Sequence, residues 1–282
     1  MTLVDYLHEI YAVQRCISDN TQYQYDRSIR CLSEWLGHAI RIADLSDLLV
    51  SRWIRYLEQL WAPRTVAAKR RDVLVVWRDA ARAGMCQPPG FVRRPRVPAT
   101  NPVAWSLEEM RALIESTGKL TGDLANGLPR SRYFRCLLET GYQTGLRRGD
   151  LLAFDVSNVA GDVAAVTQCK TDQWHLVAVE PATAECLIWL SRQLVEMQDP
   201  YWQTPLRWPH NIRWLTSSLD RLCRLADVPG GGLQRVRRTG ATAIAAAGGD
   251  PMQYLGHKTP GLAYRCYVDR TKTGAAVRPP SV

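Results

Sequence analysis

One segment of this 282-residue chain limits its possible folds more than any other. Residues 87–104 read QPPGFVRRPRVPATNPVA and contain five prolines and one glycine. Because proline lacks an amide hydrogen and fixes φ, this stretch cannot continue a helix or a central strand. The chain is long enough for more than one hydrophobic core. We therefore expect two domains, 1–86 and 105–270, with residues 87–104 as a proline- and arginine-rich linker.

The part before this segment shows the pattern of a small helical domain. Apolar residues recur at helical spacing in residues 3–14 and 45–60. Between these stretches, a helix is predicted from an N-cap at Asn20 or Thr21 to a stop at Gly37. A fourth helix is predicted from near Pro63 to Gly84. Four amphipathic helices thus fill residues 1–86.

The part after the segment begins with helices and then changes character. Ser106 and Glu109 form a capping-box pattern at the start of a predicted helix, and residues 131–145 predict a second helix. Residues 156–179 are rich in Val, Thr and Ala, with turn signals at 160–162 and 171–173, which indicates a small antiparallel sheet. Helices return from residue 182. The predicted fold is therefore mainly α with a small antiparallel β-sheet, an α+β second domain and a flexible tail at 271–282.

Charge and composition narrow the classes of partner. The formal net charge is +9, and only five of the 36 basic residues are lysine. An arginine-rich, basic chain favours a phosphate-bearing polyanion. The eight cysteines are scattered without metal-ligand spacing, so no zinc site is expected. No apolar run approaches the roughly 20 residues of a membrane span, and the first ten residues lack a signal-peptide pattern. These features predict a cytoplasmic protein without a membrane partner.

Five separated residues of the second domain suit phosphoryl-transfer chemistry without a metal: Arg147, Lys170, Arg237, His257 and Tyr267. Arginine guanidinium groups bind the non-bridging oxygens of a phosphodiester in a bidentate manner. A lysine can protonate the leaving oxygen, and a tyrosine hydroxyl can act as the nucleophile. The set therefore predicts attack on a phosphodiester.

The segments TGLRRGD, LQRVRRTGAT and LGH, in this order, resemble the tyrosine recombinases of the phage-integrase type. The resemblance extends from Thr2 to about Asp269 and is most specific in the C-terminal half. It implies that Arg147 and Arg237 contact the scissile phosphate and that Asp150 braces the site. It further implies that Lys170, on a β-hairpin, protonates the leaving 5′ oxygen, and that His257 donates a hydrogen bond to the phosphate.

The chain departs from the family pattern at two positions. Gln234 stands where the family usually has a histidine, and glutamine cannot take a proton at neutral pH. The family's nucleophilic tyrosine usually follows the histidine of LGH by nine residues, where this chain has Cys266. Tyr267 lies one residue later and Tyr264 two residues earlier. We favour Tyr267 as the nucleophile and retain Tyr264 as the alternative.

The resemblance implies a site-specific DNA recombinase that cleaves and rejoins strands through a 3′-phosphotyrosine, close to the nucleoid. It implies double-stranded DNA as the partner and a homotetramer on paired sites, without a cofactor, metal or small-molecule substrate. Residues 1–86 would be a core-binding, SAM-like domain. Its expected DNA contacts, with two in the linker, are Gln22, Gln24, Arg27, Arg64, Thr65, Lys69, Arg70, Arg71, Arg93 and Arg94. The alternatives are a non-catalytic DNA-binding protein on a degenerate recombinase scaffold, and DNA relaxation of the type IB topoisomerase kind.

Overall fold

A computed structural model of the chain describes residues 1–259 and 261–273. The chain divides into two compact units, Met1–Thr100 and Asn101–Val282, each with its own hydrophobic core. Among the described residues, helices dominate and the strands form one small antiparallel sheet, which confirms the predicted fold class. No helix in these residues combines the length and apolar character needed to cross a membrane.

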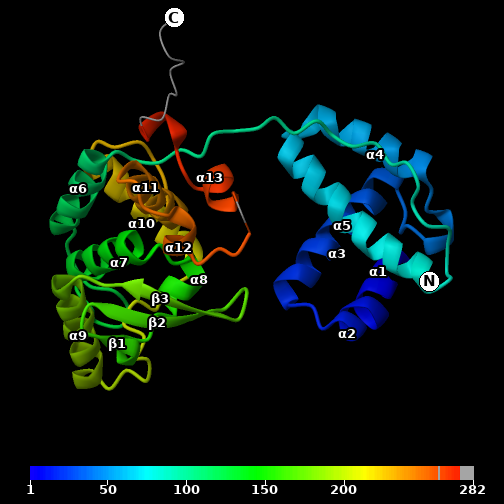
Figure 1. Cartoon of the computed structure of the whole chain (residues 1–282). Coiled ribbons are helices and arrows are strands. Elements are labelled where there is room, and N and C mark those ends of the chain that lie inside the picture. The colour runs from blue at the N-terminus through cyan, green and yellow to red at the C-terminus, as the bar shows by residue number, and fades with distance from the viewer. Residues whose placement is uncertain (260, 274–282) are drawn as a thin grey trace, which may run out of the picture. The chain divides into compact units, whose positions relative to one another are not determined.

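Unit 1 is built from amphipathic helices (Figure 1, blue to cyan). Its elements are α1 (Leu3–Tyr6), a π-helical turn (Leu7–Tyr11), α2 (Ala12–Arg15), α3 (Asp19–Leu36), a 3-10 turn (Ile42–Asp44), α4 (Asp47–Leu60) and α5 (Pro63–Arg82). α5 packs against both α3 and α4, with Trp53 and Trp77 fully buried between the helices. The expected N-cap at Asn20 or Thr21 is wrong, because the Ser18 hydroxyl accepts the Thr21 amide (3.4 Å) and α3 starts earlier.

The proline-rich segment has no regular structure but is fastened to unit 1 along its first half. The Asp47 carboxylate accepts the amides of Gly90 and Phe91 at 3.1 and 2.6 Å. Arg70 donates to the carbonyls of Val92 and Arg93 at 3.0 and 2.7 Å. The boundary between the two units therefore lies inside the segment that the sequence predicts as a linker, rather than at its start.

Unit 2 contains all of the candidate catalytic residues. Its elements are α6 (Leu107–Ser116), a 3-10 turn (Thr117–Lys119), α7 (Arg130–Thr144), α8 (Arg148–Leu152), a 3-10 turn (Val156–Asn158), β1 (Val159–Ala160), β2 (Val163–Gln168), β3 (Gln173–Ala178), α9 (Pro181–Glu196), α10 (Ile212–Leu225), α11 (Leu233–Ala246), α12 (Pro251–Leu255), α13 (Leu262–Cys266) and a 3-10 turn (Arg270–Lys272). α11 lies along α7 at the centre of the unit (Figure 1).

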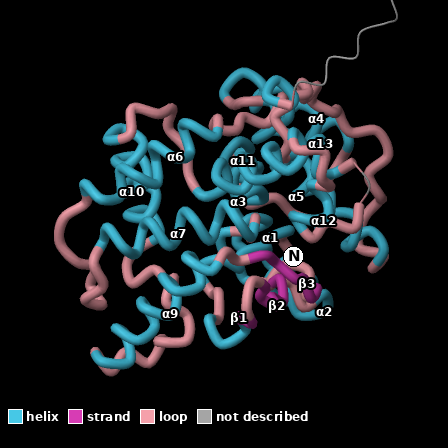
Figure 2. Tube along the Cα trace, turned by 60° about the vertical axis from the view of Figure 1, so that its left-hand side comes forward, coloured by secondary structure: helices cyan, strands magenta, loops and turns pink. Residues whose placement is uncertain are grey.

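The sheet has the order β1-β2-β3, and both pairs are antiparallel. Gln168 pairs with Gln173, so the four residues between them form the hairpin turn that carries Lys170. β3 contacts α7 and β2 contacts α8 (Figure 2, strands in magenta). The sheet thereby brings the hairpin turn near the junction between α7 and α8.

The first residues of the predicted tail take part in a regular turn. Arg270–Lys272 form a 3-10 turn, and the Lys272 ammonium lies 3.8 Å from the Glu109 carboxylate. The remainder of the predicted tail, 274–282, lies outside the described residues.

Candidate active site

Arg147 lies in the sharp turn between α7 and α8. α7 ends at Gly145, whose φ of +57° is the left-handed conformation that glycine adopts without strain. Arg147 is the N-cap residue of α8, and 23% of its side chain is exposed. Its guanidinium donates to the side-chain oxygen of Gln168 and lies 4.0 Å from the Asp150 carboxylate. Asp150 also accepts the amide of Cys169 at 2.9 Å, and therefore ties α8 to the hairpin turn.

Arg237 is almost completely buried on α11, with 1% of the residue exposed. A buried guanidinium must be hydrogen-bonded to be tolerated. It donates to the carbonyls of Gly145 and Leu255, the latter at 3.2 Å, and to Nε2 of His257 at 3.1 Å. Arg237 thus joins the end of α7 to the turn that follows α12.

His257 is neutral at physiological pH. Burial lowers its pKa to about 4, and the nearby charges of Arg237 and Arg147 act in the same direction. Because arginine can only donate, Nε2 of His257 must be the acceptor, which leaves the proton on Nδ1. Within residues 1–259 and 261–273, this Nδ1 and the Nε of Arg237 are buried without a hydrogen-bond partner. Unused donors on two side chains that contact each other are suited to an oxyanion.

Tyr267 packs against these two residues at the end of α13. Its ring centroid lies 5.0 Å from that of His257 and 5.0 Å from the guanidinium carbon of Arg237. Tyr264 is 41% exposed on the same short helix and, in the described structure, has no hydrogen bond, ring–ring or cation–π contact with either residue. The structure therefore brings Arg147, Arg237, His257 and Tyr267 into one part of unit 2.

Two of the predicted catalytic residues, Lys170 and Gln234, lie outside this group. Lys170 is exposed on the hairpin turn, and Gln234 is exposed on the first turn of α11. In the part of the chain that the structure describes, neither side chain has a hydrogen bond or ion pair with the other candidates.

Two residues at the site were missed by the sequence analysis, namely Gln168 and His175. Gln168 is 1% exposed and bonds Arg147. His175 on β3 lies 3.3 Å from the Tyr254 carbonyl, and burial together with Arg237 and Arg147 lowers its pKa. Strand alternation offered a signal, because Gln168 occupies the same face of β2 as the buried Ala164.

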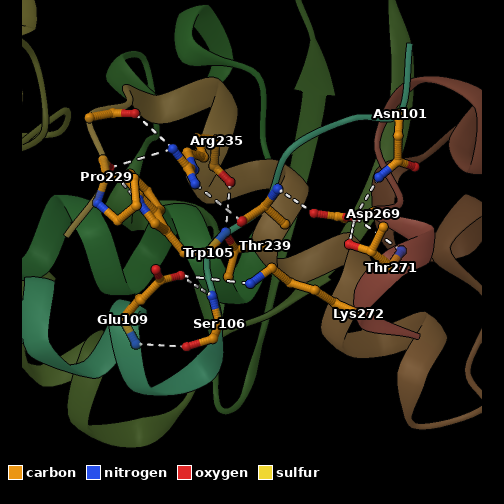
Figure 3. Close-up of polar contacts among 12 residues, drawn as sticks. Asn101, Trp105, Ser106, Glu109, Pro229, Arg235, Thr239, Asp269, Thr271 and Lys272 are labelled. Carbon is orange, nitrogen blue, oxygen red and sulfur yellow. Dashed lines mark hydrogen bonds and ion pairs between the residues drawn. The ribbon is translucent and has the colours of Figure 1, made fainter. Parts of the chain in front are cut away.

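A buried carboxylate holds the chain immediately after Tyr267 (Figure 3). Asp269 is 3% exposed and accepts from the Asn101 side chain at 2.6 Å and the Ala104 amide at 3.1 Å. It also accepts from the Thr271 hydroxyl at 2.6 Å, while its own amide donates to Thr242 on α11 at 2.9 Å. This network fixes where α13 ends and thus where Tyr267 lies.

Unit 1 presents a separate basic surface, here called the arginine groove. It is a hollow lined by Arg70, Arg71, Arg78, Arg94 and Arg96. Burial, with the like charges of Arg78 and Arg94, lowers the pKa of Arg70. Arg78 and Arg96 were missed from the sequence, although Arg78 follows Arg71 by seven residues and so shares its helix face.

The other predicted contacts in unit 1 are placed individually. Several are already engaged within the unit: Gln22 with His8, Arg27 over Tyr23, Arg64 with Thr100, Lys69 over Trp61 and Arg93 with Glu58. Gln24 and Thr65 are exposed.

The described residues contain no cluster of three or more His, Cys, Asp or Glu side chains able to hold a metal ion.

Known proteins resemble this chain in sequence and in fold. No protein-family model matches the sequence. Over 198 residues, 69% of this chain, it is 24% identical to tyrosine recombinase XerD of Neisseria meningitidis serogroup B, and the match spans 64% of that protein's length. The fold resembles a lambda integrase (75–356) dimer bound to a COC′ core site, with a TM-score of 0.74, 16% identity and full coverage of both chains. It also resembles XerH site-specific recombinase bound to palindromic difH substrate, with a TM-score of 0.65, 15% identity and coverage of 91% and 78%.

Proposed function

We propose that the chain, which resembles the tyrosine recombinases of the phage-integrase family in sequence and fold, cleaves and rejoins DNA strands. The Tyr267 oxygen attacks a backbone phosphorus, and the bond to the 5′ oxygen breaks. A 3′-phosphotyrosine remains and conserves the energy of the phosphodiester, so no nucleotide is consumed. The 5′ hydroxyl of a second strand then reverses the step.

The observation that carries this proposal is the packing of Tyr267 against Arg237 and His257. A nucleophile must lie within contact distance of the groups that bind the phosphate. Tyr267 meets this condition, whereas Tyr264 is exposed and has no ring–ring or cation–π contact with either group in the described structure. Cys266 is a poor substitute, because a soft thiolate reacts slowly with a hard phosphorus centre.

The remaining roles follow from the geometry and the resemblance. Arg147 and Arg237 bind the non-bridging oxygens, and Nδ1 of His257 supplies a further donor. Lys170 protonates the leaving oxygen, which requires its exposed side chain to reach into the DNA.

The proposed substrate is duplex DNA bound partly through the arginine groove. Related structures were solved on DNA, among them a lambda integrase tetramer bound to a Holliday junction. We propose the same order of assembly, four copies on two paired sites, for this chain.

Covalent capture tests the proposal. Wild type, Tyr267→Phe and Tyr264→Phe are incubated with a library of nicked duplexes designed to lose the fragment 5′ to the nick after cleavage, and are then denatured in detergent. An adduct lost only in Tyr267→Phe supports the function and the nucleophile, and the attached strand identifies the site. Loss only in Tyr264→Phe keeps the function but moves the nucleophile.

A second function, DNA binding without cleavage, is favoured by one observation. Gln234 replaces the family histidine and lies exposed, so the described site lacks a base at that position. Salt-sensitive binding to the library without any adduct would support this alternative. Relaxation of supercoiled plasmid without site preference would instead indicate topoisomerase activity.

A further inference from the structure

Gln168 is a buried polar side chain within the candidate active site. It ends β2, and only 1% of the residue is exposed. A buried amide costs stability unless both its oxygen and its nitrogen find partners. The groups to which the Gln168 side chain is hydrogen-bonded therefore indicate its structural role.

The oxygen and the nitrogen of its side-chain amide bond groups in three separate segments. The side-chain oxygen accepts from Arg147 and from the hydroxyl of Thr171 in the hairpin turn, the latter at 3.1 Å. The side-chain nitrogen donates to the carbonyl of Leu255 at 3.4 Å. Arg237 donates to the same carbonyl at 3.2 Å, so Gln168 is linked to both arginines of the site.

The backbone of Gln168 holds the hairpin turn as well. Its carbonyl accepts the amides of Thr171 and Asp172 at 3.1 and 2.8 Å. Lys170 lies in the turn that these hydrogen bonds close. The direction in which its side chain projects therefore depends on Gln168, which also contacts Arg147. The close approach of Gly256 completes the arrangement, because a Cβ there would lie 2.5 Å from the Gln168 nitrogen.

We propose that Gln168 is a positioning residue that holds Arg147, the Leu255–His257 turn and the base of the Lys170 hairpin as one unit. It touches no reacting atom in this role. Its effect on chemistry, which rests on the proposed function, is to keep the leaving-group acid aligned with the phosphate-binding arginine.

Hydrogen exchange of the free protein tests the structural half of the proposal, whether or not the chain is active. In Gln168→Met, which keeps the length but loses all three side-chain hydrogen bonds, the amides of Thr171, Asp172 and His257 should all exchange faster. In Gln168→Glu, which still accepts but no longer donates, the hairpin amides should stay protected while the Leu255–His257 turn loses protection. The control is Gln173→Met, directly opposite on β3, whose side chain makes no hydrogen bond within the described residues. Chemical denaturation confirms that each variant is folded.

Cleavage kinetics on the duplex recovered by covalent capture test the chemical half. That duplex is also made with sulfur replacing the bridging 5′ oxygen, because a thiolate, with a thiol pKa near 8.5, leaves without a proton. Lys170→Ala should be slow on the oxygen substrate and largely restored on the sulfur one. Gln168→Met should lose about 10²-fold on the oxygen substrate, with part of the loss restored by sulfur, whereas Arg147→Ala should show no restoration.

Two results overturn the inference. If Gln168→Met matches Gln173→Met in exchange at both turns, Gln168 does not hold the segments together. If its cleavage defect is the same on oxygen and sulfur, it does not position Lys170. Absence of cleavage by wild type overturns the proposed function instead and leaves the exchange result decisive for the structural role.

Discussion

At the scale of single residues, the site keeps its positive charge available by pairing it with neutral oxygens. Arg237 donates to two carbonyls and a neutral histidine while its Nε stays unused, and in the described structure it pairs with no carboxylate. Arg147 bonds an amide and has Asp150 only at 4.0 Å. Carbonyl dipoles stabilise a buried cation without cancelling its charge. The cost of burial is therefore met while the attraction for a phosphate is preserved.

The lowered pKa of His257 predicts a specific dependence of stability on pH. Its pKa is about 4 when folded, against 6.5 for the ordinary side chain. Between these values the unfolded chain binds a proton that the folded chain does not, so stability falls as pH falls through this window. His257→Gln retains an acceptor for Arg237 and removes the titration. Urea unfolding across the window should show a steeper loss for wild type, and parallel curves would contradict the assigned protonation state.

Gly256 is predicted to be intolerant of any side chain. Its φ is +62°, and a Cβ would lie 3.0 Å from Cγ of His175 as well as close to Gln168. Gly256→Ala should destabilise the fold by at least about 1 kcal/mol, through backbone strain and displacement of these neighbours. Gly118→Ala is the control, because its Cβ would meet nothing within 4 Å. Equal denaturation midpoints for the two variants would show that the turn after α12 adapts freely.

Sequence motifs indicated Arg147, Arg237, His257 and Tyr267, which the structure brings together, because each lies in a distinctive local segment. Gln168 and His175 lie in a short strand with no such motif, and their role depends on a turn some 80 residues away. That proximity is created by the fold. Strand alternation could have indicated that Gln168 is buried, but not which groups it bonds.

At the scale of elements, α13 is too short to be stable alone and depends on the segment after it. The helix has five residues, and isolated helices below about 12 residues are marginal in water. Hydrogen bonds to Asp269 attach the following segment to both the start of unit 2 and α11. The position of Tyr267 is thus set by tertiary contacts rather than by helix propensity.

Asp269→Asn should therefore be destabilising, and more so at neutral pH. Burial raises the pKa of Asp269, but hydrogen bonds from Thr271, Ala104 and Asn101 outweigh it and lower the pKa below 3.8. The stabilisation is present above about pH 4 and is lost as pH falls through the folded-state pKa. We expect a cost of about 1.5–3 kcal/mol at pH 7.

Unfolding measured at neutral pH and near pH 3 checks this, because the difference between wild type and Asp269→Asn should shrink in acid. Asp162→Asn provides a control, since Asp162 is exposed in the turn between β1 and β2. If the free energies of unfolding of wild type and Asp269→Asn differ by the same amount at both pH values, the negative charge of Asp269 is not what stabilises the segment.

Helix boundaries were predicted correctly where a single local sequence signal determines them. The capping box of Ser106 and Glu109 starts α6 as expected, with both hydrogen bonds formed. The start of α3 was misplaced because Ser18, Asn20 and Thr21 are all good N-cap residues, and propensity alone does not choose among them. In the structure Ser18 is the N-cap, and the helix that it starts packs against α5.

At the scale of the whole molecule, the sequence reveals that residues 87–104 lack regular structure but not that their first half is bound. Prolines exclude helix and strand, whatever the context. Attachment to unit 1 depends on Asp47 and Arg70, which bond backbone groups of the segment. Backbone groups are the same whatever the side chain, so these hydrogen bonds cannot be recognised from the sequence. The arginine groove exists only because this attachment brings Arg94 and Arg96 next to α5.

The groove, rather than the net charge of +9, should govern DNA affinity. Each phosphate contact contributes about 0.9 to the slope of log K against log salt concentration. Arg78→Gln combined with Arg96→Gln should therefore reduce the slope by roughly 2 and weaken binding alike for all sequences. The control removes the same charge from Arg30 and Arg41 of unit 1, which pair with Asp26 and Asp44. Titration of fluorescent duplexes at several salt concentrations separates the cases. Equal reductions in both double variants would mean that DNA responds to overall charge, whereas a reduction confined to the groove variant would identify the groove as the phosphate-binding surface of unit 1.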